Sequence, residues 1–377
     1  MAWHHLQYAL GLAQLGHEVL FLEDSDYYPS CYDPSTHLIG TDPTYGLQFA
    51  ERAFSRLGLR ESWAYFDAHQ SRWYGPATDK VLSFCNDADI LLNVSGVNPI
   101  RSWLEQIPVR VLIDTDPVYT QIRHLKDADA YASAARHNAF FSFGELVETS
   151  ESAMPNDQFD WRPTRQPVVL DQWPFGKGPA NGAFTTVMQW DSYPAVEWNG
   201  RRFGMKSESF EVLRDLPRRV RVPLEIALGG SSAPRQELEG LGWRIVDPLE
   251  VTRDVWTYQM YLQSSRGELS VAKHGYVVGR TGWFSERSAC YLATGRPVIV
   301  QDTGFSRYLP CGEGLWAFDD ARSAVEAIEA VAANYEIHCR AARELAEEYF
   351  DSSRVLTSLL DRAFAVAASS STAAVTQ

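Results

Sequence analysis

The chain has few cysteines, and they are widely spaced. Its 377 residues contain five, with no Cys-x-x-Cys pair among Cys31, Cys85, Cys290, Cys311 and Cys339. A zinc site or a disulfide framework needs cysteines at short, regular spacing, so neither is predicted. This cysteine usage is typical of a reducing compartment, and the predicted location is the cytoplasm.

Basic blocks and long apolar runs are also missing. The net charge is −14 at pH 7 and no five or six basic residues follow one another, so an electrostatic grip on nucleic acid is not expected. No apolar run approaches the about 18 residues of a transmembrane helix, and residues 1–18 lack the marks of a signal peptide. The expected partners are small molecules, with no nucleic acid and no transmembrane segment. The oligomeric state stays open.

What the sequence does contain is the alternation of strands and helices that is typical of an α/β fold. Short apolar runs ending in polar or glycine turns predict strands of parallel sheets at 18–24, 88–96, 109–117, 139–145, 184–190, 223–230, 243–248, 268–272, 296–302 and 315–320. Helical periodicity covers 2–15, 321–334, 336–349 and 352–368. A length of 377 residues suits two or three domains of about 150 residues.

Proline and glycine mark the predicted domain junction. They gather between 150 and 182, with little helical periodicity. We therefore expect an N-terminal domain over 1–175, a second domain over 176–350, and a final segment, 351–377, that holds a helix and a disordered tail. Aromatic, irregular sequence from about 25 to 75 is interpreted as a long insertion or surface loop.

The chain opens on a helix, which is unusual for a domain of this class. Doubly wound α/β domains place a strand and a glycine-bearing turn before their first helix. We therefore expect that the first strand of the N-terminal domain is missing from this sequence and lies upstream of it.

The densest chemical signal lies between 267 and 305. Ser285 can cap a helix that runs to Thr294, and Gly295 ends that helix before the strand at 296–302. Free backbone N–H groups and the helix dipole favour a phosphate at such a helix start.

Positive and flexible residues surround this helix start. Gly282 permits close approach of the backbone, and Arg280, Lys273 and Arg296 supply charge. The sequence therefore predicts a phosphate contact in the turn 280–285, although a strand-to-helix turn of purely structural role would have the same pattern.

This segment resembles a known family. Gly295-Arg-Pro-Val-Ile-Val, followed by Gln301-Asp-Thr-Gly-Phe, resembles the donor half of GT-B glycosyltransferases, similar to families 1 and 4 of bacterial type. Leu15-Gly-His-Glu-Val resembles the end of the first helix of their acceptor domain, and the strand 184–190 opens a second domain where a donor domain would open. The resemblance implies an α/β GT-B fold, in which two Rossmann-like domains face each other across a cleft. It also implies an N-terminal acceptor domain, a C-terminal domain that binds a UDP-, GDP- or TDP-sugar donor, and a final helix that crosses back.

The resemblance suggests which residues hold the donor diphosphate. Lys206, together with Arg201 or Arg202, follows the first strand of the donor half, where such enzymes place cations. Lys206 and Lys273 are two of only five lysines in the chain. The turn at Gly230 offers backbone amides to ribose or phosphate, or is an ordinary strand ending.

Two carboxylates are candidates for the hydroxyls of the sugar or ribose, namely Glu268 and Glu286. Retaining members of the family often carry two glutamates separated by seven residues in this region, and here those positions hold Gly282 and Cys290. The choice between a retaining and an inverting mechanism therefore stays open.

An inverting mechanism needs a base near the acceptor hydroxyl. His4 and His5, at the start of the first helix, are candidates because the pKa of histidine lies near neutrality. Asp114 and Asp116, after a predicted strand, are alternatives. No metal is predicted to be required, since GT-B transfer usually relies on protein cations.

The predicted function is thus transfer of a sugar from a nucleotide-sugar donor to an unidentified acceptor, with no cofactor. Two alternatives stay open, a nucleotide-sugar 2-epimerase and a non-catalytic protein that binds a sugar or nucleotide on the same fold.

Overall fold

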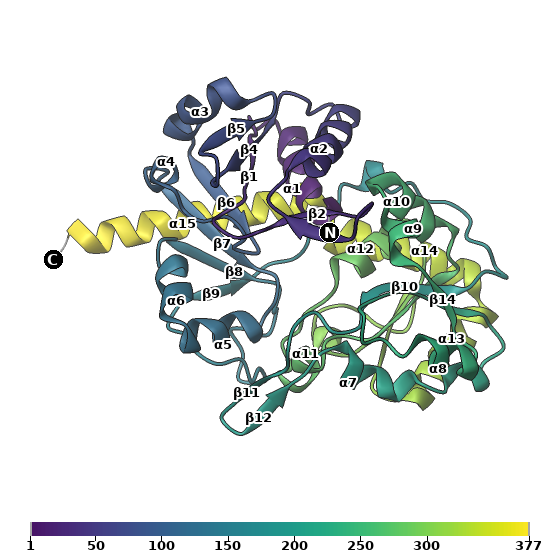
Figure 1. Cartoon of the computed structure of the whole chain (residues 1–377). Helices are drawn as coiled ribbons and strands as arrows, with labels where there is room; N and C mark the ends of the chain where they lie inside the picture. Colours follow the sequence, from purple (N-terminus) through teal and green to yellow (C-terminus); the bar gives the residue numbers. More distant parts are fainter. Residues whose placement is uncertain (1, 376–377) are drawn as a thin grey trace.

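A computed structural model describes residues 2–375 of the chain. In Figure 1 the purple and blue N-terminal part lies at the upper left and the green C-terminal part at the lower right. The predicted α/β class is confirmed, because most strands pair in parallel and helices separate them along the chain. No helix within the described residues has the length and apolar character that crossing a membrane demands.

The N-terminal part holds two separate sheets. The elements in chain order are α1 (Ala2–Gln14), β1 (Phe21–Asp24), β2 (Cys31–Asp33), β3 (Leu38–Gly40), α2 (Thr44–Arg56), β4 (Trp63–Asp67), β5 (Arg72–Tyr74), η1 (Thr78–Lys80), α3 (Val81–Asp87), β6 (Ile90–Val94), α4 (Ser102–Glu105), β7 (Val109–Asp114), α5 (Tyr119–Lys126), α6 (Ala128–Ala134), β8 (Ala139–Ser142), β9 (Trp161–Pro163) and η2 (Leu170–Gln172). One sheet has the order β1-β4-β5 and the other β6-β7-β8-β9, while β2 and β3 form a hairpin. The first strand of one sheet, β1, and the first of the other, β6, do not pair with each other.

The C-terminal part is built on one parallel sheet. Its elements are β10 (Phe184–Gln189), β11 (Val196–Trp198), β12 (Arg201–Phe203), α7 (Lys206–Phe210), η3 (Glu211–Leu213), η4 (Leu216–Arg218), β13 (Leu224–Gly229), α8 (Arg235–Leu241), β14 (Arg244–Val246), α9 (Pro248–Thr252), α10 (Val255–Ser264), β15 (Gly267–Ser270), α11 (His274–Val278), α12 (Glu286–Ala293), β16 (Val298–Gln301), η5 (Phe305–Arg307), β17 (Leu315–Phe318), α13 (Ala321–Ala333), α14 (Tyr335–Tyr349) and α15 (Ser352–Val375). The strand order is β14-β13-β10-β15-β16-β17. Strands such as β16, Val-Ile-Val-Gln, are buried at every residue, as expected where helices cover both faces of a sheet.

Two expectations about local structure are wrong. The segment from 25 to 75 is not one irregular insertion, because it contains the β2–β3 hairpin, helix α2 and the strands β4 and β5. The apolar face of α2 has helical spacing at Leu47, Ala50 and Phe54, a signal that the surrounding tyrosines, prolines and glycines obscured. The tail is also more regular than predicted, since α15 continues through Val375.

Helices α1 and α15 connect the two parts. The Trp3 indole N–H donates to the Val255 carbonyl at 2.8 Å, and the Gln7 side-chain oxygen accepts from the Trp173 indole at 3.1 Å. Trp3, Trp173 and Tyr291 belong to one apolar core that spans both parts. Helix α15, yellow in Figure 1, returns after Phe350 and contacts α1, β7 and β8.

Candidate functional site

The order of strands in the C-terminal sheet points to one edge as a ligand site. From β10 the chain proceeds to β13 and β14 on one side, and then continues on the other side with β15, β16 and β17. In open parallel sheets, ligands bind at the carboxyl ends of the strands where the order reverses in this way. Here that switch point lies beyond Gln189 of β10 and Ser270 of β15.

A buried ion pair between Glu268 and Arg287 lies at this edge of the sheet. The Glu268 side chain is fully buried, and its Oε1 accepts a hydrogen bond from Arg287 Nε at 2.5 Å. Arg287 Nη2 also donates to Ser270 Oγ at 2.9 Å, and Nη1 donates to the Val187 carbonyl at 3.0 Å. Glu268 Oε2 is buried without a partner among the described residues. Arg287, in the first turn of α12, is thereby held at the switch point in one orientation.

Lys206 adds an unpaired cation to this cluster. It begins helix α7, after β10, and its side chain is half-buried. Burial, with repulsion from Arg287 and Lys273, lowers the pKa of Lys206 well below its usual range. Within residues 2–375 no hydrogen bond or ion pair joins Lys206 Nζ to another residue. A positive group in such surroundings is stabilised by an anion that binds beside it.

Lys273 lies in an ion pair that crosses between the two parts of the molecule. Its Nζ is 2.8 Å from Asp116 Oδ1 and 2.8 Å from Tyr193 Oη. The Tyr193 hydroxyl donates to Asp116 Oδ2, and the Tyr276 hydroxyl donates to Asp116 Oδ1. The structure thus brings together Lys273, predicted to bind the donor, and Asp116, a candidate base. In this arrangement the Asp116 carboxylate is already engaged with one cation and two hydroxyls.

Asp114 is engaged in a different way. Its carboxylate is buried and accepts hydrogen bonds from Thr120 Oγ1 at 2.7 Å, Ser142 Oγ at 2.8 Å and Gln121 Nε2 at 3.1 Å. Burial raises the pKa of Asp114 while these hydrogen bonds oppose the rise. These contacts hold the turn between β7 and α5 in place, and they leave little capacity for accepting a substrate proton.

The pKa values of the two histidines of α1 are both lowered. Burial, with His5 beside it, lowers the pKa of His4 well below its usual range, and burial lowers the pKa of His5 to about 4. His4 Nε2 is buried without a partner among the described residues, and the ring lies 5.7 Å from that of Phe143. A lowered pKa favours the unprotonated imidazole, which can accept a proton, but it also makes that imidazole a weaker base than one with a pKa near neutrality.

The turn 280–285 is held mainly by protein contacts. The Gly282 N–H donates to the Thr303 carbonyl at 2.9 Å, and Arg280 pairs with Glu151 at 3.3 Å on the surface. Gly282 has φ +74°, and a Cβ there would lie 2.9 Å from Leu146 N. The need for glycine at this position is therefore explained by close packing against the N-terminal part.

The start of α12 leaves more room for a ligand atom. The Ser285 side chain makes no capping hydrogen bond. A small cavity of about 10 Å³, room for about one water, lies among Ser270, Ser285, Arg287, Ser288 and Gln301. Ser288 Oγ and Gln301 Oε1 are buried there without partners in the described chain.

The remaining predicted residues have separate environments, and the Arg296 guanidinium donates to the carbonyls of Gln263 and Gly176 rather than to the turn 280–285. Arg201 is exposed on the β11–β12 hairpin, where its Nη1 is 3.5 Å from the Val278 carbonyl. Gly230, with φ +103°, follows β13 and packs against Trp190. Burial raises the pKa of Glu286, whose Oε1 lies 3.7 Å from Cys290 Sγ. No cluster of three or more metal-ligating side chains is found in residues 2–375.

Sequence reasoning did not single out Arg287, Ser270 or Tyr193. An arginine inside a predicted helix usually lies on a solvated face, and only the packing of α12 on β15 makes Arg287 buried and paired. Its position directly after Glu286, in the first turn of a helix expected to face a phosphate, was the one available signal.

The fold is shared with several solved structures, whereas neither a family model nor a curated protein matches the sequence. An α-glucosyltransferase solved with UDP and a 13-mer DNA is 13% identical, with a TM-score of 0.55 over 96% of this chain and 95% of that one. Anabaena HepE, solved with UDP and glucose, is 10% identical, with a TM-score of 0.55 over 92% of this chain and 98% of that one. A glycosyltransferase from Rickettsia africae is 10% identical, with a TM-score of 0.51 over 96% and 94%.

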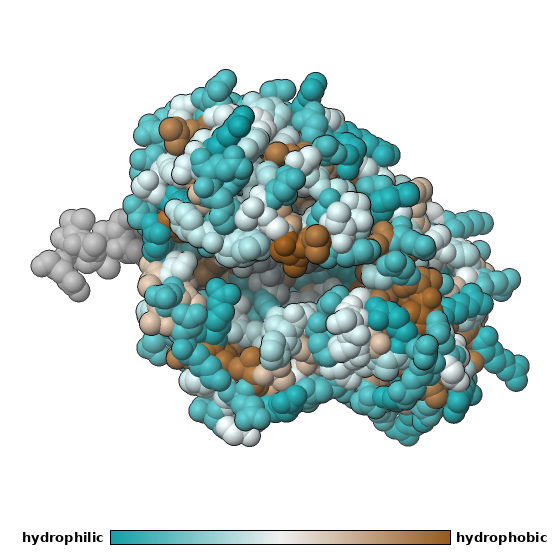
Figure 2. All heavy atoms as spheres, viewed as in Figure 1, coloured by the Kyte–Doolittle hydropathy of each residue, from teal (hydrophilic) through white to brown (hydrophobic). Residues whose placement is uncertain are grey.

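These likenesses extend over both parts of the chain and not one part alone. The surface is hollowed near the centre of the view in Figure 2, between the upper N-terminal lobe and the lower lobes. A fold of two α/β domains with parallel sheets, matched over nearly its full length by these enzymes, is the architecture that the resemblance implied. The chain has the GT-B fold.

Proposed function

We propose that this protein is a glycosyltransferase that uses a nucleotide-sugar donor. The observation that carries the proposal is the cation cluster at the switch point of the C-terminal sheet, where Lys206 lies beside Arg287 and Lys273 and has no partner in the described chain. A diphosphate is the anion best suited to offset several cations at once. The structural neighbours solved with UDP favour a UDP-sugar as the donor.

The residues around the cluster then have distinct roles. Lys206 and Arg287 stabilise the negative charge that develops on the leaving diphosphate, which is where electrostatic catalysis contributes most. The N–H groups at Ser285, at the start of α12, take a phosphate oxygen. Glu268 is a positioning residue, because it holds Arg287 in its orientation. Among the candidate bases we favour His4, because its Nε2 has no partner among the described residues while Asp114 and Asp116 are already engaged.

The acceptor in this proposal is a small molecule that enters from the N-terminal domain. A net charge of −14 disfavours a nucleic-acid acceptor, even though one neighbour was solved with DNA. The free cysteines of the described chain suit a cytoplasmic enzyme. We assign no metal and no cofactor, since the protein cations supply the positive charge.

Nucleotide binding is the first test. UDP, GDP and TDP are each added at increasing concentration, and the thermal midpoint of unfolding is recorded. A ligand at one hundred times its Kd stabilises the native state by about 2.7 kcal/mol, which is readily measured. Stabilisation by a nucleoside diphosphate supports the proposal, and a chain that responds to none of the three contradicts it.

Product analysis then separates the possible activities. The protein is incubated with UDP-sugars and a panel of small hydroxylated acceptors, and the products are identified by mass spectrometry. Release of UDP with formation of a glycoside supports a transferase. Conversion of one UDP-sugar into another indicates an epimerase, and binding without turnover of any donor indicates a non-catalytic protein.

A further inference from the structure

The two sheets of the N-terminal domain are separated by a cavity. Its volume is about 1150 Å³, and it is lined on one side by Leu20 and residues 21–23 of β1, and on the other side by residues 90–94 of β6. Helix α1 contributes Leu6, Ala9 and Leu12, and α15 contributes Leu360 and Phe364. In Figure 1 the sheet that holds β1 lies directly above the one that holds β6. We call this cavity the slot.

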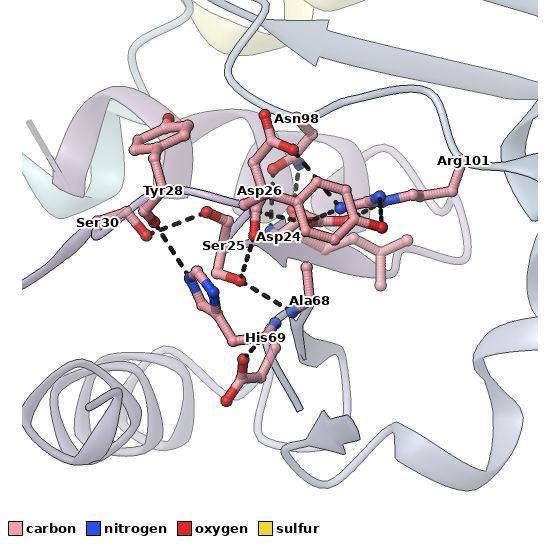
Figure 3. Close-up of polar contacts among 12 residues, drawn as sticks. Asp24, Ser25, Asp26, Tyr28, Ser30, Ala68, His69, Asn98 and Arg101 are labelled. Carbon is pink, nitrogen blue, oxygen red and sulfur yellow. Dashed lines mark hydrogen bonds and ion pairs between the residues drawn. The ribbon is translucent and has the colours of Figure 1, made fainter. Parts of the chain in front are cut away.

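One side chain already forms backbone-like hydrogen bonds with β1 at the end of the slot. Asn98 Oδ1 accepts from the Asp24 N–H at 3.0 Å, and Asn98 Nδ2 donates to the Leu22 carbonyl at 2.8 Å. In a parallel ladder, a residue opposite Glu23 would make the same two bonds. Its N–H would donate to the Leu22 carbonyl, and its C=O would accept from the Asp24 N–H. Figure 3 shows Asn98 against Asp24 in this position. The Asn98 amide therefore occupies the place of one residue of a strand parallel to β1.

The Asn98 contacts also show that β1 and β6 run in the same direction. Asn98 follows β6 closely, and Asn93 of β6 donates from Nδ2 to the Asn98 carbonyl at 2.9 Å. The carboxyl ends of β1 and β6 thus lie together, and the preceding residues of both strands face the same slot. Because the N–H and C=O of one residue in a strand point to the same side, the Leu22 N–H also faces the slot, where no strand of the described chain pairs with it.

Both faces of the slot are mainly apolar, with Glu23 of β1 among the few charged residues in its lining. On one face, Ile90 and Leu92 of β6 pack in the cluster that contains Leu356 and Leu359 of α15. On the other face, Leu91 packs in the cluster of α3 and α4, together with Leu20 and Leu22. A segment between β1 and β6 would therefore be covered by helices on both sides, an environment that favours a continuous run of valine, isoleucine and leucine.

We propose that the slot binds an extended, apolar segment of about five residues, the typical length of a strand, running parallel to β1 and β6. The segment is supplied by the polypeptide that leads into α1. Helix α1 packs over the slot, and it starts at the carboxyl edge of the domain, where His4 contacts Phe143 directly after β8. A strand in the slot, followed by α1 and then β1, forms a strand–helix–strand unit, the connection by which neighbouring parallel strands are usually joined. Its insertion joins the sheets into one, with the order β5-β4-β1, the inserted strand, and β6-β7-β8-β9.

The test extends the full chain ahead of residue 1. One version carries Val-Ile-Val-Ile-Val and a short glycine-rich turn, and its control carries a Ser/Gly segment of equal length. Hydrogen exchange is followed at Leu22 and at residues 90–92, with amides of β13 and β16 as an internal record that the other domain is folded. We expect exchange at Leu22 to slow by about tenfold or more in the first version only, because a ladder hydrogen bond exchanges only when the sheet opens. The thermal midpoint of the N-terminal domain is expected to rise in parallel.

A second variant separates occupation of the slot from a general effect of added apolar residues. Leu92→Arg introduces a charge into the slot wall, and the added strand is expected to give no protection at Leu22 in that background. Equal exchange at Leu22 in the strand version and the Ser/Gly version overturns the proposal. Protection of Leu22 in the chain without extension also overturns it, if it depends on protein concentration, because a second copy is then the occupant. Protection by a small apolar molecule alone, with none from the added strand, overturns it as well.

Discussion

Replacing Lys206 with methionine is expected to weaken nucleotide binding and, at the same time, to stabilise the protein. Methionine keeps the length of the side chain and removes its charge. A hydrogen bond to a charged group contributes about 1.5–3 kcal/mol, which corresponds to a loss of about tenfold to a hundredfold in UDP affinity. The gain in stability follows because burial and repulsion from Arg287 and Lys273 act on the charged Lys206 in the free protein.

The pH dependence of that stability gain has a definite sign. The pKa of Lys206 is lower in the folded protein than in the unfolded chain, where it has the ordinary value of about 10.4. At any pH between these two pKa values, the unfolded chain binds more protons than the folded protein. The stability of the wild type therefore rises with pH through this window. Lys206→Met removes the contribution, so the stability difference between variant and wild type is largest at low pH and shrinks as the pH rises.

Two measurements test this reasoning together. Calorimetry with UDP gives the affinity, and urea denaturation at several pH values gives the free energy of unfolding. Lys177→Met serves as the matched control, because Lys177 is exposed and no change is expected in either quantity. If Lys206→Met binds UDP as tightly as the wild type, Lys206 is not part of the donor site. If it is less stable than the wild type at neutral pH, the charge of Lys206 is compensated in the free protein and the argument from unpaired charge is wrong.

Three further predictions follow from the same structure. Glu268→Ala leaves the buried Arg287 without its carboxylate partner, and urea denaturation is expected to show a loss of about 3–5 kcal/mol; a loss below about 1 kcal/mol would mean that water reaches the pair. Gly282→Ala is expected to lower the free energy of unfolding by about 1–3 kcal/mol more than Gly58→Ala does. Both glycines have nearly the same φ (+74° and +75°), but only Gly282 has protein atoms within 4 Å of the added Cβ. Equal thermal midpoints for the two variants would contradict this. Burial lowers the pKa of His137 to about 4, so stability should rise as the pH increases from about 4 to about 6.5, and His137→Gln should flatten that part of the pH profile; an unchanged profile would assign the effect to other groups.

The sequence by itself determined the class of fold and the positions of most strands. Runs such as 223–230 and 296–302 have an apolar centre and end in polar or glycine turns, and the strands β13 and β16 lie inside them. The start of helix α12 after Ser285 was also predicted, because residue type and periodicity are local features, although the Ser285 side chain makes no capping hydrogen bond. Signals of this kind depend on neighbours along the chain, so they are present before any tertiary contact forms.

Tertiary structure alone decided the chemistry of the candidate site. Lys273 and Asp116 lie far apart in the sequence and form one ion pair across the two domains, while Lys206 was left without a partner. The separation of the N-terminal strands into two sheets, with a cavity between β1 and β6, is likewise a feature of the tertiary structure. The physical reason is the same in each case. Pairing, burial and pKa are set by groups that the fold brings together from distant segments, and local periodicity carries no information about which segments these are.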